Sequence, residues 1–194
     1  MMCGRYFIDV DEKDMQEIIE ILRTYYANDS FNVNEIFPHQ NAPILVGVHD
    51  LVKPTVMRWG FDGFDKTKII NARSETMKEK KLFSSSYSNK RCVVPTNGFY
   101  EWKTIEGSKK KEKYYFKLKN SSMLYLAGIY QGFDLDNQFV IITTQANASM
   151  EEYHHRMPLI LERNQVRDWL FNDKKADSIL QQVPVNLTAI IVNR

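Results

Sequence analysis

The centre of the chain reads Arg91-Cys92-Val93-Val94-Pro95-Thr96-Asn97-Gly98-Phe99-Tyr100-Glu101-Trp102. Its first five residues predict a strand stopped by proline, and residues 98–102 predict the next strand, which carries one carboxylate among aromatic side chains. Short apolar runs recur at residues 5–10, 44–48, 52–59, 69–73, 114–118, 124–130, 139–144 and 185–192. Many short strands with few helices indicate an α+β fold, built on a curved, mainly antiparallel sheet or partial β-barrel with flanking helices.

The clearest helix is expected near the start of the chain. Met15, Ile18, Ile19 and Leu22 recur at helical spacing, so residues 12–26 should form an amphipathic helix with Asp11 as its N-cap. Shorter helices are expected at residues 74–81, 165–170 and 177–182. Residues 28–34 and 60–68 are expected as polar or surface connections, and residues 49–50 as a hairpin tip.

Length and composition limit the class of protein to which the chain can belong. The 194 residues predict one domain over 1–194, and an apolar content of 43% is ample for a single core. No long apolar run and no signal-peptide pattern is present, which predicts a non-membrane, cytoplasmic protein, nucleoid-associated if bacterial. The two cysteines form no disulfide framework and have no metal-ligand spacing, so no metal or cofactor is expected. A net charge of +2 permits a nucleic-acid partner only if basic residues cluster, and no obligate protein partner is evident.

The N-terminal stretch, Met1-Met2-Cys3-Gly4-Arg5-Tyr6-Phe7, contains a cysteine next to the chain start. If processing makes Cys3 the first residue, its α-amine and thiol form a 1,2-aminothiol, which closes on an aldehyde as a five-membered thiazolidine. The amine has a pKa of about 7.7–8.0 and the thiol about 8.5, so both nucleophiles are partly available near neutral pH. The alternative interpretation is that Cys3 is a small buried apolar residue.

Further polar residues stand at the ends of apolar strands. They are Asn71 with Arg73 and Glu75, Glu101, and His154 with Arg156. Neighbouring Tyr100 and Trp102 suggest a partly apolar surround for Glu101, which would raise its pKa toward acid/base use. Taken singly, each residue also fits an ordinary strand-end or turn position.

Several separate motifs occur together and in order. They are Cys3-Gly4-Arg5-Tyr6, Pro38 through Pro43, Arg58-Trp59-Gly60, Asn71-Ala72-Arg73-Ser74-Glu75, Arg91-Cys92-Val93-Val94-Pro95 with Gly98-Phe99-Tyr100-Glu101-Trp102, Thr143-Thr144 with Ala146-Asn147, and His154-His155-Arg156-Met157-Pro158. In this combination the chain resembles the SOS response-associated peptidase (SRAP) family, also described as abasic-site processing proteins.

The resemblance implies covalent capture of abasic sites in single-stranded DNA. It makes Cys3 the nucleophile, Asn71 a hydrogen-bonding residue for the sugar or the N-terminal residue, Glu101 a proton carrier, and His154 a residue that binds or protonates the sugar and adjoining phosphate. It assigns DNA binding to Arg5, Pro38, Trp59, Arg73 and Arg156, with the arginines on phosphates and Trp59 stacked on a base or wedged beside the lesion. A lyase side activity is expected, and the peptidase label is expected to concern exposure of the protein's own cysteine.

Two departures from the family pattern bear on this expectation. Met1-Met2 precedes Cys3, where family members usually begin Met-Cys, so both methionines must be absent or removed before the aminothiol exists. Phe61-Asp62-Gly63-Phe64-Asp65 stands where the family usually has a proline and a second tryptophan. Two alternatives stay open: a cysteine peptidase using Cys3 with His154 and Glu101, and a non-covalent single-strand binding module.

Overall fold

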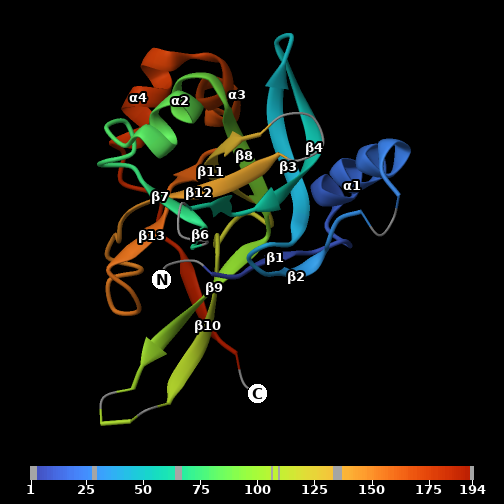
Figure 1. Cartoon of the computed structure of the whole chain (residues 1–194). Coiled ribbons are helices and arrows are strands. Elements are labelled where there is room, and N and C mark those ends of the chain that lie inside the picture. The colour runs from blue at the N-terminus through green and yellow to red at the C-terminus, as the bar shows by residue number, and fades with distance from the viewer. Residues whose placement is uncertain are drawn as a thin grey trace.

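A computed structural model describes residues 4–27, 30–63, 67–105, 107–108, 110–132 and 137–192. Within these ranges the chain forms two main sheets, a two-stranded pair and four helices (Figure 1). This mixed architecture of antiparallel-dominated sheets and flanking helices confirms the predicted α+β class.

The larger sheet closes on itself. Its ring consists of β3 (Asn41–Val48), β4 (Leu51–Trp59), β8 (Arg91–Thr96), β11 (Leu124–Gln131) and β12 (Gln138–Gln145). β12 pairs with β4, β4 with β3, β3 with β8, β8 with β11, and β11 again with β12. Only the β12–β4 step is parallel. Three short strands extend the sheet: β7 (Asn71–Arg73), β13 (Arg156–Pro158) and β14 (Ile160–Leu161). The predicted barrel is therefore present.

The smaller sheet has five strands in the order β15-β10-β9-β1-β2. They are β1 (Tyr6–Ile8), β2 (Asn34–Ile36), β9 (Gly98–Thr104), β10 (Lys111–Lys117) and β15 (Thr188–Ile191). The β9–β10 hairpin projects away from the barrel in the lower part of Figure 1. β5 (Phe61–Asp62) and β6 (Lys68–Ile69) form the separate pair.

The helices lie on the outside of the barrel. They are α1 (Lys13–Tyr25), α2 (Lys81–Asn89), α3 (Gln165–Phe171) and α4 (Asp173–Leu180). Figure 1 shows α2, α3 and α4 together at one end of the barrel, and α1 alone on the opposite side. α1 buries Met15, Ile19 and Leu22, as its periodicity predicts. In the described part of the chain, no helix has the length and apolar character that a membrane span requires.

Several local predictions were wrong. The N-cap of α1 is Glu12, whose carboxylate accepts the Met15 N–H, in place of Asp11. Residues 74–80 form turns, and the helix of this region begins only at Lys81. β8 continues through Pro95 to Thr96, because the fixed φ of proline fits an extended backbone and only its missing N–H must be tolerated.

Two connections also contain strands that the sequence did not predict. β2 begins at Asn34, within the expected polar connection, and β5 and β6 lie within the expected loop at 60–68. Residues 64–66, between β5 and β6, lie outside the described ranges.

Candidate functional site

β12 brings two polar strands together from distant parts of the sequence. β7 pairs with β12 in parallel, with Asn71 opposite Ile141 and Arg73 opposite Thr143. β13 pairs with the same strand in antiparallel fashion, with Arg156 opposite Gln145. The two strands flank β12 on opposite edges, and Figure 1 shows both at the left of the barrel. Asn71, Arg73 and Arg156 therefore lie around the C-terminal half of β12.

A surface hollow of about 450 Å³ opens at this place. It is lined by Arg73, Gln145, Ala146, Glu151, His155 and Arg156. A second hollow of about 440 Å³ shares Gln145 and Ala146 with the first and continues past Lys78 toward the end of α4. Arg73 is exposed at the first hollow, so its guanidinium is accessible to a phosphate.

His154 is half-buried in the segment that precedes β13. Its Nδ1 accepts the Arg156 N–H at 3.0 Å, and its ring stacks on His155 with the centroids 4.4 Å apart. Burial, and next the neighbouring His155, lower the pKa of His154 below its ordinary value of 6.5. His154 is therefore neutral at pH 7, and since Nδ1 accepts, its ring hydrogen lies on Nε2.

Glu101 lies on β9 and is only 4% exposed. In the sheet register it stands opposite Tyr114, whose ring is 4.7 Å from that of Tyr153, the residue before His154. An ion pair between Lys103 and Glu152 makes a second link between β9 and the same segment. The smaller sheet thus contacts the segment before β13 through neighbours of Glu101 and His154, although the two segments are remote in sequence.

The surround predicted for Glu101 was wrong in one respect. Side chains alternate across a strand, so Tyr100 and Trp102 lie on the face of β9 opposite to Glu101. The Lys113 ammonium stands over the Tyr100 ring at 3.9 Å and near the Trp102 ring at 5.9 Å, and both rings are partly exposed. Glu101 is buried by the core side of the sheet, with Phe99 as its buried neighbour on the same face.

The outer face of β9 carries a cluster that the sequence did not predict. The Arg5 guanidinium lies over Phe37 at 4.3 Å and over Trp102 at 4.9 Å, and it contacts Glu35 at 3.3 Å. Glu35 also accepts a hydrogen bond from Lys113 at 2.6 Å. Partial burial raises the pKa of Glu35, but Lys113 and Arg5 outweigh it and the net shift is downward. Alternation along β9 could have placed Trp102 on the face opposite Glu101, whereas its position beside Arg5 depends on the pairing of β9 with β1.

Trp59 does not fit its predicted role. Its ring is 0% exposed, packs at 5.1 Å from Tyr6 and stacks on Phe139 at 6.2 Å. Its indole N–H donates to the Ile70 carbonyl at 3.1 Å, directly before Asn71. A ring without exposed surface cannot stack on a base, so Trp59 instead ties β1 and the start of β7 to the barrel.

The remaining predicted residues differ in accessibility. The Arg156 side chain is 11% exposed and contacts Glu75 and Thr143, so its guanidinium is already bonded within the protein. Pro38 is half-buried in the turn between β2 and β3. Cys3 lies outside the described residues, as do Phe64 and Asp65. Within the described ranges, no three His, Cys, Asp or Glu side chains approach closely enough to hold a metal ion.

Comparison with known protein families agrees with these motifs. A family model described as SOS response associated peptidase (SRAP) matches residues 2–194. The chain belongs to the SRAP family. This membership confirms the resemblance drawn from the motifs.

Similar SRAP proteins support the assignment. Abasic site processing protein YoaM of Bacillus subtilis is 30% identical over 193 residues, covering 94% of this chain and 85% of the relative. Abasic site processing protein YoqW of the same organism is 32% identical over 187 residues, covering 91% and 83%. A crystal structure of a protein from Bacteroides thetaiotaomicron superposes with a TM-score of 0.80 at 25% identity, covering 98% of this chain and 92% of that one.

Proposed function

We propose that this SRAP protein captures abasic sites in single-stranded DNA as a covalent thiazolidine on Cys3. The observation that carries the proposal is the placement of Asn71 and Arg73 on β7 and of His154 just before β13, with β7 and β13 both paired to β12. The Tyr114–Tyr153 ring contact adds Glu101 to this region, because Tyr114 stands opposite Glu101 and Tyr153 precedes His154. The names of YoaM and YoqW supply the substrate class, because both are abasic site processing proteins. An abasic deoxyribose in its open form presents an aldehyde, the group with which a 1,2-aminothiol reacts.

The reaction proceeds in two bond-forming steps. The Cys3 α-amine adds to the aldehyde carbon and the resulting carbinolamine loses water, which leaves an imine. The Cys3 sulfur then adds to the same carbon and its proton passes to nitrogen, which closes the five-membered ring. The net change is loss of one water molecule. Neither step consumes an oxidant or a cofactor.

The surrounding residues have distinct roles in this proposal. Glu101 relays protons during opening of the sugar and formation of the imine, while the Nε2–H of neutral His154 donates to the sugar or its phosphate. Asn71 hydrogen-bonds the sugar or the N-terminal residue. Arg73, exposed at the hollow, contacts a DNA phosphate, and Arg5 with the neighbouring Trp102 and Phe37 faces the strand.

Two further reactions belong to this proposal, one that follows imine formation and one that must precede it. The imine acidifies the adjoining sugar carbon, so β-elimination of the 3′ phosphate gives a lyase activity. Removal of Met1 and Met2 by hydrolysis of the Met2–Cys3 bond frees the amine, and this self-processing accounts for the peptidase label of the family.

Intact mass spectrometry tests the proposal directly. The purified protein is measured alone and after incubation with a single-stranded oligonucleotide that carries one abasic site. We expect loss of both methionines and an added mass equal to the oligonucleotide less one water. An oligonucleotide whose abasic sugar is reduced to the alcohol is the matched control and should give no adduct. A protein that begins at Cys3 and still forms no adduct would contradict the proposal.

Replacing Glu101 by glutamine should slow adduct formation by about 10²- to 10⁴-fold, the usual contribution of a positioned acid or base. The substitution preserves shape at a residue that is 4% exposed, so the circular dichroism spectrum should stay unchanged. Glu20→Gln on the exposed side of α1 removes the same charge away from the site and should react at the wild-type rate. A Glu101→Gln protein with unchanged kinetics would remove Glu101 from its role.

A further inference from the structure

Both carboxylate oxygens of Glu75 accept hydrogen bonds from the guanidinium of Arg156. The Nη1–Oε1 distance is 2.7 Å and the Nη2–Oε2 distance is 2.9 Å. Nη2 also donates to the Thr143 carbonyl on β12 at 2.6 Å. A bidentate, charge-assisted pair of this kind fixes the orientation of the arginine as well as its position. The Arg156 side chain is therefore held against β12 and turned away from solvent.

The backbone of Arg156 in turn orients His154. The Arg156 N–H donates to Nδ1 of His154 at 3.0 Å. The same segment is anchored at two further points, where Ala146 N–H donates to the His155 carbonyl and His154 N–H donates to the Met150 carbonyl. An N–H group can donate only to an unprotonated ring nitrogen, so this contact selects the tautomer with hydrogen on Nε2.

Glu75 is ionised at neutral pH, where it pairs with Arg156. Partial burial raises the pKa of Glu75, but hydrogen bonds from Arg156 and its own backbone N–H, with the charges of Arg156 and Arg73, bring it below the ordinary value. A carboxyl with a lowered folded-state pKa stabilises the fold above its ordinary pKa and loses this contribution only as the pH falls through the lowered value. The pair with Arg156 is thus intact at neutral pH.

We propose that Glu75 is a positioning residue that acts through Arg156 on His154. It holds the Arg156 side chain on β12, so that the Arg156 backbone N–H stays aimed at Nδ1 and His154 presents Nε2–H to the substrate. It also pairs with the guanidinium, which is then less available to a DNA phosphate. This inference deepens the proposed function and rests on it for the reaction, whereas the tautomer of His154 can be measured without any DNA.

The first arm of the test is the side-chain ¹⁵N spectrum of the histidines in the free protein at neutral pH. The chain has only four histidines, so His154→Asn and His155→Asn variants assign the two signals. In the wild type, Nδ1 of His154 should show the shift of an unprotonated nitrogen. In Glu75→Gln and Glu75→Ala the two nitrogens should move toward the averaged shifts of exchanging tautomers. Glu151→Gln, which removes the same charge from a lining residue of the hollow, should leave the wild-type pattern.

The second arm separates binding from reaction. In Glu75→Gln, Arg156 is less fully paired, so an undamaged single-stranded oligonucleotide should bind more tightly, with a salt slope steeper by about one charge. Crosslinking at saturating abasic DNA should nevertheless slow by about 10-fold to 100-fold, because the donor is misplaced. A purely structural role would not produce tighter binding together with a slower reaction.

The two experiments also distinguish failure of this inference from failure of the proposed function. A wild-type His154 tautomer in both Glu75→Gln and Glu75→Ala would overturn the inference whatever the reaction turns out to be. A wild-type protein that shows the expected tautomer but forms no adduct would instead count against the proposed function alone. Glu75→Asp keeps the charge and shortens the side chain. In this conservative variant the His154 nitrogen shifts should lie between those of the wild type and those of Glu75→Ala.

Discussion

Replacing Cys3 by serine will abolish the heat-stable adduct with abasic DNA while leaving an imine that a hydride reductant can trap. Serine keeps the α-amine, so condensation with the aldehyde still takes place. It lacks the thiolate, and a neutral hydroxyl is a far weaker nucleophile toward the imine carbon than sulfur is near neutral pH. The measurement is denaturing electrophoresis of adducts after heating, with and without reductant. A heat-stable adduct of Cys3→Ser formed without reductant would rule out the thiazolidine.

The chain contains its own control for this experiment in Cys92. Cys92 is 0% exposed on β8, and burial raises the pKa of its thiol, so it is neither accessible nor ionised at neutral pH. Cys92→Ala should therefore give the full wild-type yield of adduct, although the small cavity lowers stability somewhat. Loss of the adduct in a folded Cys92→Ala protein would mean that the reactive thiol had been assigned to the wrong cysteine.

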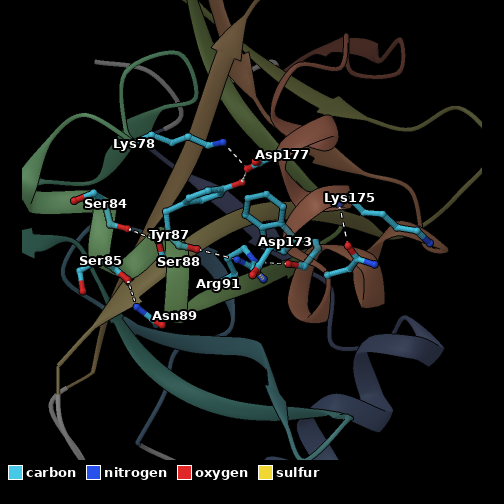
Figure 2. A network of polar contacts seen from close by, with 12 residues as sticks. Lys78, Ser84, Ser85, Tyr87, Ser88, Asn89, Arg91, Asp173, Lys175 and Asp177 are labelled. Atoms are coloured by element: carbon cyan, nitrogen blue, oxygen red, sulfur yellow. Dashed lines mark hydrogen bonds and ion pairs between the residues drawn. The ribbon is translucent and has the colours of Figure 1, made fainter.

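The second large effect is expected at Arg91, the first residue of β8. Arg91 is 9% exposed and donates to the carbonyls of Trp169 at 2.6 Å and Tyr87 at 3.0 Å. These carbonyls belong to the last turns of α3 and α2, where helix carbonyls have no partner within their own helix. The Arg91 guanidinium thus caps the C-terminal ends of two helices, where the helix dipole makes a positive charge favourable. Figure 2 shows Arg91 between Tyr87 on α2 and Asp173 on α4.

Arg91→Met should lower the free energy of unfolding by roughly 2–6 kcal/mol, because two buried carbonyls lose their donor at about 1–3 kcal/mol each. Methionine keeps the length and apolar stem of the side chain, so packing is largely preserved. Urea denaturation measures the difference. Asp173→Asn is the matched control: its carboxylate pairs with Arg91 at 2.7 Å, but the side chain is 83% exposed. We expect it to cost less than about 1 kcal/mol. Equal effects of the two substitutions would show that the ion pair, and not the carbonyl contacts, carries the stability.

Periodicity located those elements whose own sequence contains the signal. The spacing of Met15, Ile19 and Leu22 predicted α1, and the hairpin tip at His49 and Asp50 is present with positive φ at both residues. α2 was missed because Lys81–Asn89 is rich in serine and has little helix propensity of its own. Phe83 and Tyr87 are buried against the barrel, and Arg91 supplies the missing C-terminal donor, so contacts from elsewhere in the chain stabilise this helix.

The functional side chains likewise divide into those that sequence motifs identified and those whose roles only the fold revealed. The motifs picked out Asn71, Glu101 and His154. The fold places Asn71 beside β12, and the Tyr114–Tyr153 contact joins the strand opposite Glu101 to the segment before His154. Sequence patterns could not tell that Trp59 is buried, since a tryptophan at the end of a strand suits a core and a surface equally well. They also listed Glu75 without a role, because a carboxylate and an arginine 81 positions apart give no local sign of contact.

By itself, then, the sequence determined the α+β class, the family and the identity of the polar residues that carry chemistry. All three depend on residue type and short-range spacing, which are local properties of the chain. Only the tertiary structure decided which face of β9 is buried, which arginine is exposed at the hollow, and which nitrogen of His154 bears the hydrogen. Those outcomes depend on strand pairing and on side chains distant in sequence, and such contacts exist only once the two sheets have packed together.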